Sequence, residues 1–322
     1  MCENRIIVYA NYSIFPNYSK KDYTTGIVEK RPKIVVIVGP TASGKSALAV
    51  KLARKFGGEI ISADSRQVYR GMDIGTGKIT QKEMRGVPHH LLSVVSPKKV
   101  FTVGDYVPMA ERALRDILRR GKLPVICGGA GFYILALVDK LQLPNVPPNP
   151  ALRKRLKKKT ASKLFALLKR LDPAFALRID RNNPHRLIRA VEIARALGHV
   201  PPLTAVSPYD PLFIGITLPK ILLAKRIHKR LLARIRAGML DEVRSLVKQG
   251  VSVKRMHSLG LEYRYCADHI KGTLTKEEFL LRLESAIRQY AKRQMTWFKK
   301  EKRIRWVGND LTKTERLVKN FL

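Results

Sequence analysis

Strongly apolar segments alternate with segments of helical periodicity through the N-terminal half of the chain. The clearest is Lys33-Ile-Val-Val-Ile-Val38, a run of apolar residues that predicts a strand buried on both faces of a parallel sheet. Gly57 and Gly121 end two of the helical stretches. The predicted elements are strands at 33–38, 59–63 and 123–127 and helices at 47–56 and 107–120. Strands and helices that alternate in this way predict a doubly wound α/β sheet.

The pattern changes at residues 142–150, where four prolines in nine residues exclude a continuing helix or central strand. The segment that follows is helical in its spacing and strongly basic. A strand at 213–217 then returns, with two or three helices after it, the last at 276–300 and capped by Thr275 and Glu278. We therefore expect an α/β domain from 32–142 and 207–322, an all-helical insertion domain at 143–206, and a disordered N-terminal extension at 1–31.

Charge narrows the choice of partner. The 322 residues include 63 basic and 25 acidic side chains, a formal net charge of +38. Self-repulsion of this size disfavours a compact state unless a polyanion neutralises it, so nucleic acid is the first candidate and an anionic membrane the second. A proteome that is basic throughout is the alternative explanation. Within 153–163, seven basic residues favour contact with RNA over a merely solubilising role.

Three cysteines, Cys2, Cys127 and Cys266, form no CxxC pair, which excludes a zinc-finger appendage and suits the reducing cytoplasm. No apolar run approaches the roughly 18 residues that span a bilayer. The N-terminus also lacks the apolar region of a signal peptide.

A phosphate-binding loop follows the first strand. Gly39-Pro-Thr-Ala-Ser-Gly-Lys-Ser46 matches G-x-x-x-x-G-K-[ST] and precedes a predicted helix, as the mechanism of such loops requires. Lys45 supplies a positive charge and Ser46 can hold a magnesium ion. The expected diphosphate-binding residues are Gly39, Thr41, Ala42, Ser43, Gly44, Lys45 and Ser46.

The loop alone does not distinguish a nucleotide from a diphosphate. ATPases of this type usually carry an acidic residue after a second strand, but here the third strand ends in Cys127-Gly-Gly-Ala130. Asp64 is the only acid at a strand end near the loop. This argues against simple ATP hydrolysis and favours a reaction in which diphosphate is the leaving group.

Further motifs follow in a fixed order. They are Asp64-Ser-Arg-Gln-Val-Tyr69, Gly71-Met-Asp-Ile-Gly-Thr76, Pro88-His-His-Leu91, Gly128-Gly-Ala-Gly-Phe-Tyr133, Arg186-Leu-Ile-Arg-Ala-Val-Glu192 and Tyr290-Ala-Lys-Arg-Gln-Met-Thr-Trp-Phe298. Together with the phosphate loop, this set closely resembles the bacterial tRNA dimethylallyltransferases, also called tRNA isopentenyltransferases, over roughly residues 33–307.

The resemblance implies a P-loop kinase-like parallel sheet flanked by helices, with an all-helical insertion domain that grips the anticodon stem-loop. It implies dimethylallyl diphosphate as donor, N6 of the adenosine 3′ to the anticodon as acceptor, and Mg²⁺ as cofactor. Asp64 would be the general base, with Lys45 as the second catalytic residue. The implied tRNA-binding residues are Asp64, Ser65, Arg66, Gln67, Ala130, Arg153, His185, Arg186, Leu187, Ile188 and Arg189. We expect a monomer, because a ligand as large as tRNA needs an open face.

Some positions depart from the family pattern. Ala130 stands where these enzymes usually have threonine, and Leu261 and Ile287 stand where they usually have tyrosine and threonine. The spacing of Tyr290, Gln294, Trp297 and Phe298 is typical of a helix face buried in the core.

Three other functions stay open. A transferase acting on free AMP, ADP or ATP would share the loop and Asp64 without needing a basic insertion. A P-loop kinase would leave the DSRQVY segment unexplained. An RNA-binding module with a degenerate phosphate loop has only Ala130 in its support.

Overall fold

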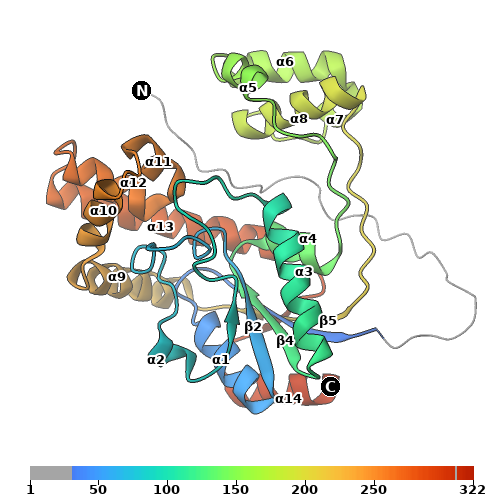
Figure 1. The fold of residues 1–322 in the computed structure, drawn as a ribbon, viewed down its shortest axis with the longest axis vertical. Helices are drawn as coiled ribbons and strands as arrows, with labels where there is room; N and C mark the ends of the chain where they lie inside the picture. The colour runs from blue at the N-terminus through green and yellow to red at the C-terminus, as the bar shows by residue number, and fades with distance from the viewer. Residues whose placement is uncertain (1–30, 309) are drawn as a thin grey trace, which may run out of the picture. The chain divides into compact units, whose positions relative to one another are not determined.

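A parallel sheet forms the centre of the structure, a computed structural model that describes residues 31–308 and 310–322. Within this part of the chain six strands lie in the order β3-β2-β4-β1-β5-β6, and every pair is parallel. Helices flank the sheet (Figure 1). The α/β fold expected from the sequence is therefore confirmed. The strands are β1 (Lys33–Val38), β2 (Gly58–Ala63), β3 (His89–His90), β4 (Leu123–Gly128), β5 (Asp210–Ile216) and β6 (Arg305–Val307).

The position of β1 explains its apolar sequence. It lies between β4 and β5, with Val35 opposite Val125 on one side and Leu212 on the other. Ile34 to Ile37 are completely buried, so neither face of this strand meets water. The ends of β1, β2 and β4 meet at one edge of the sheet, because Val38 and Ala63 both pair with Gly128.

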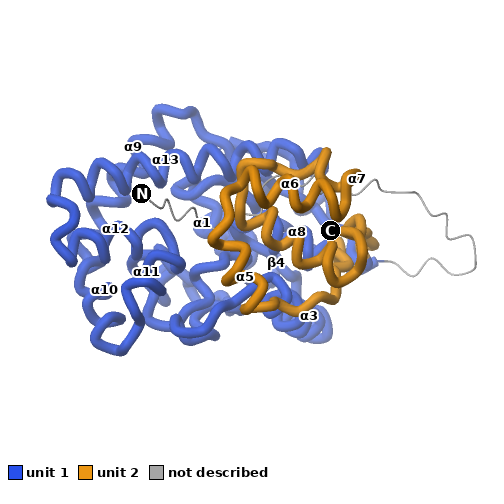
Figure 2. Tube along the Cα trace, turned by 90° about the horizontal axis from the view of Figure 1, so that it is seen from above, with its two compact units in different colours: residues 1–6, 29–138, 208–322 blue, residues 7–28, 139–207 orange. Residues whose placement is uncertain are grey.

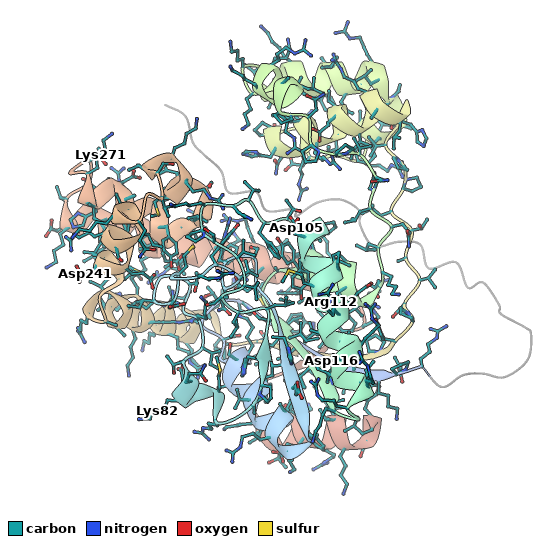
Figure 3. The ribbon with its side chains drawn as sticks, in the orientation of Figure 1. Lys82, Asp105, Arg112, Asp116, Asp241 and Lys271 are labelled. Carbon is teal, nitrogen blue, oxygen red and sulfur yellow. The ribbon has the colours of Figure 1, made fainter. Side chains whose placement is uncertain are left out.

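Capping residues decide where the helices begin. Thr102 and Asp105 form a capping box, so α3 (Val103–Arg119) starts four residues before the apolar periodicity does. Asp105, Arg112 and Asp116 follow one another along this helix (Figure 3). The predicted capping box of Thr275 and Glu278 is confirmed at the start of α13. The other helices in this part are α1 (Lys45–Lys55), α2 (Gln81–Met84) and α4 (Gly131–Val138) before the insertion, and α9 (Lys220–Arg236), α10 (Met239–Lys248), α11 (Val253–Leu259), α12 (Leu261–Ile270), α13 (Lys276–Phe298) and α14 (Leu311–Phe321) after it.

The number of C-terminal helices was predicted wrongly. Among the described residues six helices follow β5, not two or three, and the last is α14. Short helices separated by glycines divide the apolar periodicity, and their packing together forms a core that also includes Val68, Tyr69 and Met72. This core fixes the segment that follows β2 against α9, α10 and α12.

The described residues divide into two compact units (Figure 2). The α/β unit contains residues 31–138 and 208–322, apart from 309, and the helical unit contains residues 139–207. The helical unit has its own core, which includes Leu164, Leu168, Leu187 and Val191. Its helices are α5 (Pro150–Leu156), α6 (Ala161–Leu171), α7 (Pro173–Ala176) and α8 (Pro184–Leu197).

Two further observations complete the description. The extension expected to be disordered, 1–31, lies outside the described residues except for Arg31. Among the helices described, none has the length and apolar character needed to cross a membrane.

Candidate active site

The loop between β1 and α1 is shaped to hold an anion. Gly39 and Gly44 have φ angles of 155° and 98°, which glycine adopts without strain, and Ala42 lies in the left-handed region at 62°. The first backbone bond of α1 joins the Leu48 N–H to the Gly44 carbonyl at 3.2 Å. The N–H groups of Lys45, Ser46 and Ala47 therefore have no acceptor inside the helix, and the helix dipole adds partial positive charge there.

Two of the predicted diphosphate ligands have their backbone donors already in use. The Thr41 N–H donates to Gln294 Oε1 at 2.8 Å, and the Ser43 N–H donates to the Pro40 carbonyl at 3.3 Å. The Ser43 hydroxyl is buried and has no hydrogen-bond partner among the described residues. The loop thus leaves a buried polar atom whose partner the described chain does not supply.

Lys45 lies beside the ends of the neighbouring strands. Its Nζ donates to the Pro40 carbonyl at 3.3 Å, and the charged side chains that act on it are those of Arg230, Asp64 and Arg234. Burial, together with the two arginines, holds the pKa of Lys45 below its usual range even though Asp64 opposes the shift. An anion bound in the loop would relieve this burden on the ammonium group.

Cys127 ends the strand on which ATPases place an acidic residue. Its thiol is hydrogen-bonded to Ser46, and burial raises its pKa to about 11 despite the nearby Lys45. At neutral pH the group is a thiol and not a thiolate, so it adds no negative charge to the floor of the site.

Asp64 follows β2 and is held by its own turn. Its Oδ1 accepts the backbone N–H groups of Arg66 at 2.8 Å and Gln67 at 3.3 Å. Tyr290 of α13 lies close by, since burial and the Asp64 charge both raise the pKa of that tyrosine. The turn fixes the direction of the carboxylate.

The remaining residues predicted in this segment have different surroundings. The Gln67 amide donates to the Gly77 carbonyl at 3.3 Å, while its oxygen accepts from the Ser62 hydroxyl at 3.4 Å. Ser65 and Arg66 are partly buried. The side chain of Gln67 therefore braces the loop at 71–77.

Sequence reasoning missed three arginines on α9. Spaced four residues apart on one helix face, Arg226, Arg230 and Arg234 donate to the carbonyls of Ser43, Gly77 and Gly75 at 3.3, 3.2 and 3.3 Å. Burial and the neighbouring Arg234 lower the pKa of Arg230 to about 10. Asp64 and Glu262 oppose that shift, which places the Arg230 guanidinium in the same charged cluster as Asp64.

The loop that carries the Gly75 and Gly77 carbonyls is itself held by Glu242. Its carboxylate accepts the N–H groups of three successive residues, 73 to 75, at 2.7, 2.7 and 3.0 Å, and the Tyr263 hydroxyl at 2.7 Å. A side chain at Gly75 would come within 2.7 Å of Tyr263, and one at Gly77 within 1.6 Å of Arg234. At Gly75, within the 71–76 motif, the Tyr263 ring leaves no room for a side chain, and at Gly77 a φ of 57° also favours glycine.

A cavity of about 600 Å³ lies between α1, the segment at 77–85 and α14. It is also lined by Ser46 of the phosphate loop and by Arg230 of α9. Lys45 and Asp64 do not line it. We therefore do not place the reacting groups in this cavity.

Ala130 lies at the start of α4, next to the end of β2. Its N–H donates to the Ala63 carbonyl at 3.2 Å, which sets the β4–α4 loop beside the residue that precedes Asp64. Gln294 and Trp297 of α13 pack on this loop, because a Cβ at Gly129 or Gly131 would come within 2.2 Å of them. Of the four residues predicted to share a buried helix face, Gln294 and Phe298 are buried, and Tyr290 and Trp297 are partly buried. The Gln294 amide is also bonded to the phosphate loop and to the β4–α4 loop.

The tRNA-binding residues predicted in the helical unit differ in burial. Leu187 and Ile188 are buried in its core, at 0% and 6% exposure, so their side chains support the surface of the unit, and their contact with tRNA stays a prediction. Arg186 is also buried, at 3% exposure. His185, at the start of α8, is partly buried.

Arg153 and Arg189 are tied to a buried carboxylate. Arg153 donates twice to Glu192, at 2.9 and 2.7 Å, and Arg189 donates once at 2.5 Å. The backbone N–H of Asn149 adds a bond at 2.7 Å. These arginines brace α5 against α8. Exposed cations of the helical unit that have no ion pair among the described residues include Lys154, Arg155, Lys157, Lys158 and Lys159.

Comparison with known proteins identifies the family. The IPP transferase family model matches residues 67–301, and an isopentenyl transferase model matches residues 32–95. The tRNA dimethylallyltransferase of Pelotomaculum thermopropionicum is 40% identical over 288 residues, covering 86% of this chain and 91% of that protein. That of a Roseiflexus species is 42% identical over 274 residues, covering 83% and 90%.

A solved structure agrees. The tRNA isopentenylpyrophosphate transferase of Bacillus halodurans superposes with a TM-score of 0.69 at 36% identity, over 90% of this chain and 95% of that one. The two family models together span the phosphate loop and the segments that contain Asp64, Arg230 and Gln294. The chain therefore belongs to the IPP transferase family, as do the tRNA dimethylallyltransferases that it resembles.

Proposed function

We propose that this protein transfers a dimethylallyl group from dimethylallyl diphosphate to N6 of the adenosine 3′ to the anticodon in tRNA, releasing diphosphate. The observation that carries the proposal is geometric: the phosphate loop with Lys45 and the turn of Asp64 follow β1 and β2, whose ends both pair with Gly128. Arg230 donates to the Gly77 carbonyl, which also accepts from Gln67 in the turn of Asp64. This arrangement places a cationic site for anions near the carboxylate of Asp64, and a reaction that expels diphosphate and removes a proton needs both groups.

The diphosphate would be held by the first turn of α1, with Lys45 and Arg230 adding charge to its oxygens. Among the described residues no group of three or more His, Cys, Asp or Glu side chains is arranged as a metal site, so a bound Mg²⁺ would have few protein ligands. Magnesium is typically held by one or two protein oxygens plus substrate phosphates, and the Ser46 hydroxyl can supply one. When bound, the ion would neutralise charge on the leaving diphosphate.

Asp64 is proposed as the general base. The lone pair of N6 attacks C1 of the donor, the C1–O bond breaks, and diphosphate leaves with the electron pair. The proton of N6 passes to the Asp64 carboxylate, whose direction is fixed by its bonds to Arg66 and Gln67. Since the exocyclic amine of adenine is a weak nucleophile, removing this proton as the bond forms lowers the barrier.

The helical unit is proposed to bind the anticodon stem-loop through phosphates. The exposed Lys154, Arg155, Lys157, Lys158 and Lys159 support this, because exposed unpaired cations attract a polyanion in a salt-dependent way. The acceptor adenine must leave its stack, at a cost of a few kcal/mol, before N6 can reach the donor.

The acceptor can be tested directly. Purified protein is incubated with dimethylallyl diphosphate, Mg²⁺ and either unmodified tRNA transcripts or AMP, ADP and ATP, and the nucleosides are analysed by mass spectrometry. We expect isopentenyladenosine from tRNA alone, at the position 3′ to the anticodon. Prenylated free nucleotide would identify the other transferase class, and phosphorylated product from ATP would identify a kinase. RNA binding without any product would support the non-catalytic alternative.

A further inference from the structure

One side chain joins the two loops of the site. Gln294, on α13, is 7% exposed. Its Oε1 accepts the Thr41 N–H of the phosphate loop at 2.8 Å, and its Nε2 donates to the Gly129 carbonyl of the β4–α4 loop at 3.1 Å. The partners lie 253 and 165 residues away along the chain. No described backbone bond joins these two loops directly.

The chemistry of the amide suits both ends. Thr41 offers only an N–H and Gly129 only a carbonyl, so a group with one acceptor and one donor is needed, in a single orientation. The fit is close, because a Cβ at Gly129 would come within 2.2 Å of Gln294 Nε2 and 3.9 Å of Lys45 Nζ. A neutral amide meets this need next to the Lys45 ammonium without adding charge.

The two loops carry different halves of the reaction. Thr41 belongs to the segment proposed to hold the donor diphosphate, whereas Gly129 precedes Ala130, whose N–H is bonded to Ala63 beside the base Asp64. The separation of these loops sets the distance from C1 of the donor to N6 of the acceptor. A displacement of about 1 Å between reacting atoms costs on the order of 100-fold in rate.

We propose that Gln294 is a positioning residue that holds the donor loop and the acceptor loop at the separation that prenyl transfer requires. This inference rests on the proposed function. It assigns to Gln294 a role beyond core packing, for which burial alone would require only an apolar side chain of similar volume.

Two variants separate the bonds from the packing. Gln294→Met keeps the length and fills the space but removes both bonds, and Gln294→Glu keeps the oxygen for Thr41 while losing the donor for Gly129. Gln289→Met, on an exposed position of the same helix, is the matched control. Three quantities are measured for each protein: the single-turnover rate of transfer to tRNA, the dissociation constant of dimethylallyl diphosphate, and amide exchange in peptides spanning 39–44 and 128–131.

For Gln294→Met we expect a single-turnover rate about 100-fold lower, with the dissociation constant of dimethylallyl diphosphate unchanged. Exchange at the Thr41 amide should be roughly 2- to 10-fold faster, the effect of one lost hydrogen bond. Gln294→Glu should keep the slow exchange at the Thr41 amide, but its single-turnover rate of transfer should fall as in Gln294→Met. Gln289→Met should behave as wild type in all three measurements.

A Gln294→Met protein that is folded and transfers at the wild-type rate would overturn the proposal. So would a rate that falls only in proportion to a loss of folded protein. If the wild type itself transfers nothing, the proposed function fails and the catalytic part of this proposal fails with it. The loop contact is still decided in that case, because unchanged exchange at Thr41 in Gln294→Met would contradict it.

Discussion

The charge cluster around Glu192 gives the sharpest structural prediction. Its carboxylate is 1% exposed and accepts bonds from the Asn149 backbone, Arg153 and Arg189. Glu192→Gln keeps the shape of the side chain but removes its charge and turns an NH₂ group toward arginine donors. Because both arginines meet at this one carboxylate, the bond between α5 and α8 depends on it.

The cost can be estimated from the exposure of the partners. Removing one member of a buried ion pair costs about 3–5 kcal/mol, because the other charge stays buried. Here the Arg153 and Arg189 side chains are 34% and 21% exposed and can turn to water, so the estimate falls to about 2–3 kcal/mol. Since 1.4 kcal/mol is a factor of ten, local opening of the helical unit should increase about 30- to 150-fold.

Hydrogen exchange measures this opening within the helical unit itself. Peptides from α8 should exchange about 30- to 150-fold faster in Glu192→Gln, while peptides from β1 and α1 stay unchanged. Arg195→Gln is the control, since it alters a charge at an exposed position of the same helix. Equal exchange in Glu192→Gln and Arg195→Gln would refute the assignment of Glu192 as a structural anchor.

The pH dependence has a definite sign. Burial alone would raise the pKa of Glu192, but the bonds from Arg153, Asn149 and Arg189 outweigh it and hold the pKa below the usual value. The stabilisation is therefore present above the unfolded-state pKa near 4.5 and is lost as the pH falls through the lower folded-state pKa. The exchange difference between wild type and Glu192→Gln should shrink as the pH is lowered below about 4.5.

Three further outcomes test other parts of the account. Burial and neighbouring arginines lower the pKa of Lys45, so this side chain loses its charge at a pH below the usual lysine value of 10.5. The KM for dimethylallyl diphosphate, measured over a series of pH values, should therefore begin to rise before the pH reaches 10.5. Arg230→Ala should reduce kcat by about 100- to 1,000-fold, the effect of losing one donor to the leaving oxygens, which single-turnover kinetics would measure. Lys157→Gln and Lys158→Gln should each reduce the slope of log K for tRNA against log salt by about 1, whereas Arg153→Gln should mainly destabilise the helical unit.

Local signals made the phosphate loop and the central strands predictable. Three of these signals are each encoded by a short stretch of sequence, and each is found where it was expected. They are the phosphate-loop motif, the apolar run of β1 and the Thr275–Glu278 capping box. Helices after β5 were undercounted because their short apolar faces acquire meaning only when they pack together. The strand β6 has only three residues and carries no comparable local signal, whereas α14, which Asp310 caps, was overlooked.

The site was less predictable than the fold. The excess of basic residues concealed the spacing of Arg226, Arg230 and Arg234, although their four-residue repeat could have revealed a common face. The spacing around Gln294 correctly indicates burial, but no spacing tells that an amide will meet two loops over 160 residues away. The motif at 186–189 led us to predict tRNA contacts for Leu187 and Ile188, whose side chains are buried. A motif does not distinguish the residues that support a surface from those that form it.

The most direct test of the central claim is the single-turnover rate of prenyl transfer to tRNA by Asp64→Asn. Asparagine keeps the oxygen that accepts the Arg66 and Gln67 N–H groups, so the turn is preserved while the base is removed. We predict a rate about 100- to 10,000-fold lower, with the dissociation constant for dimethylallyl diphosphate unchanged. A variant that transfers at the wild-type rate would contradict the account, because the proton of N6 would then have another acceptor.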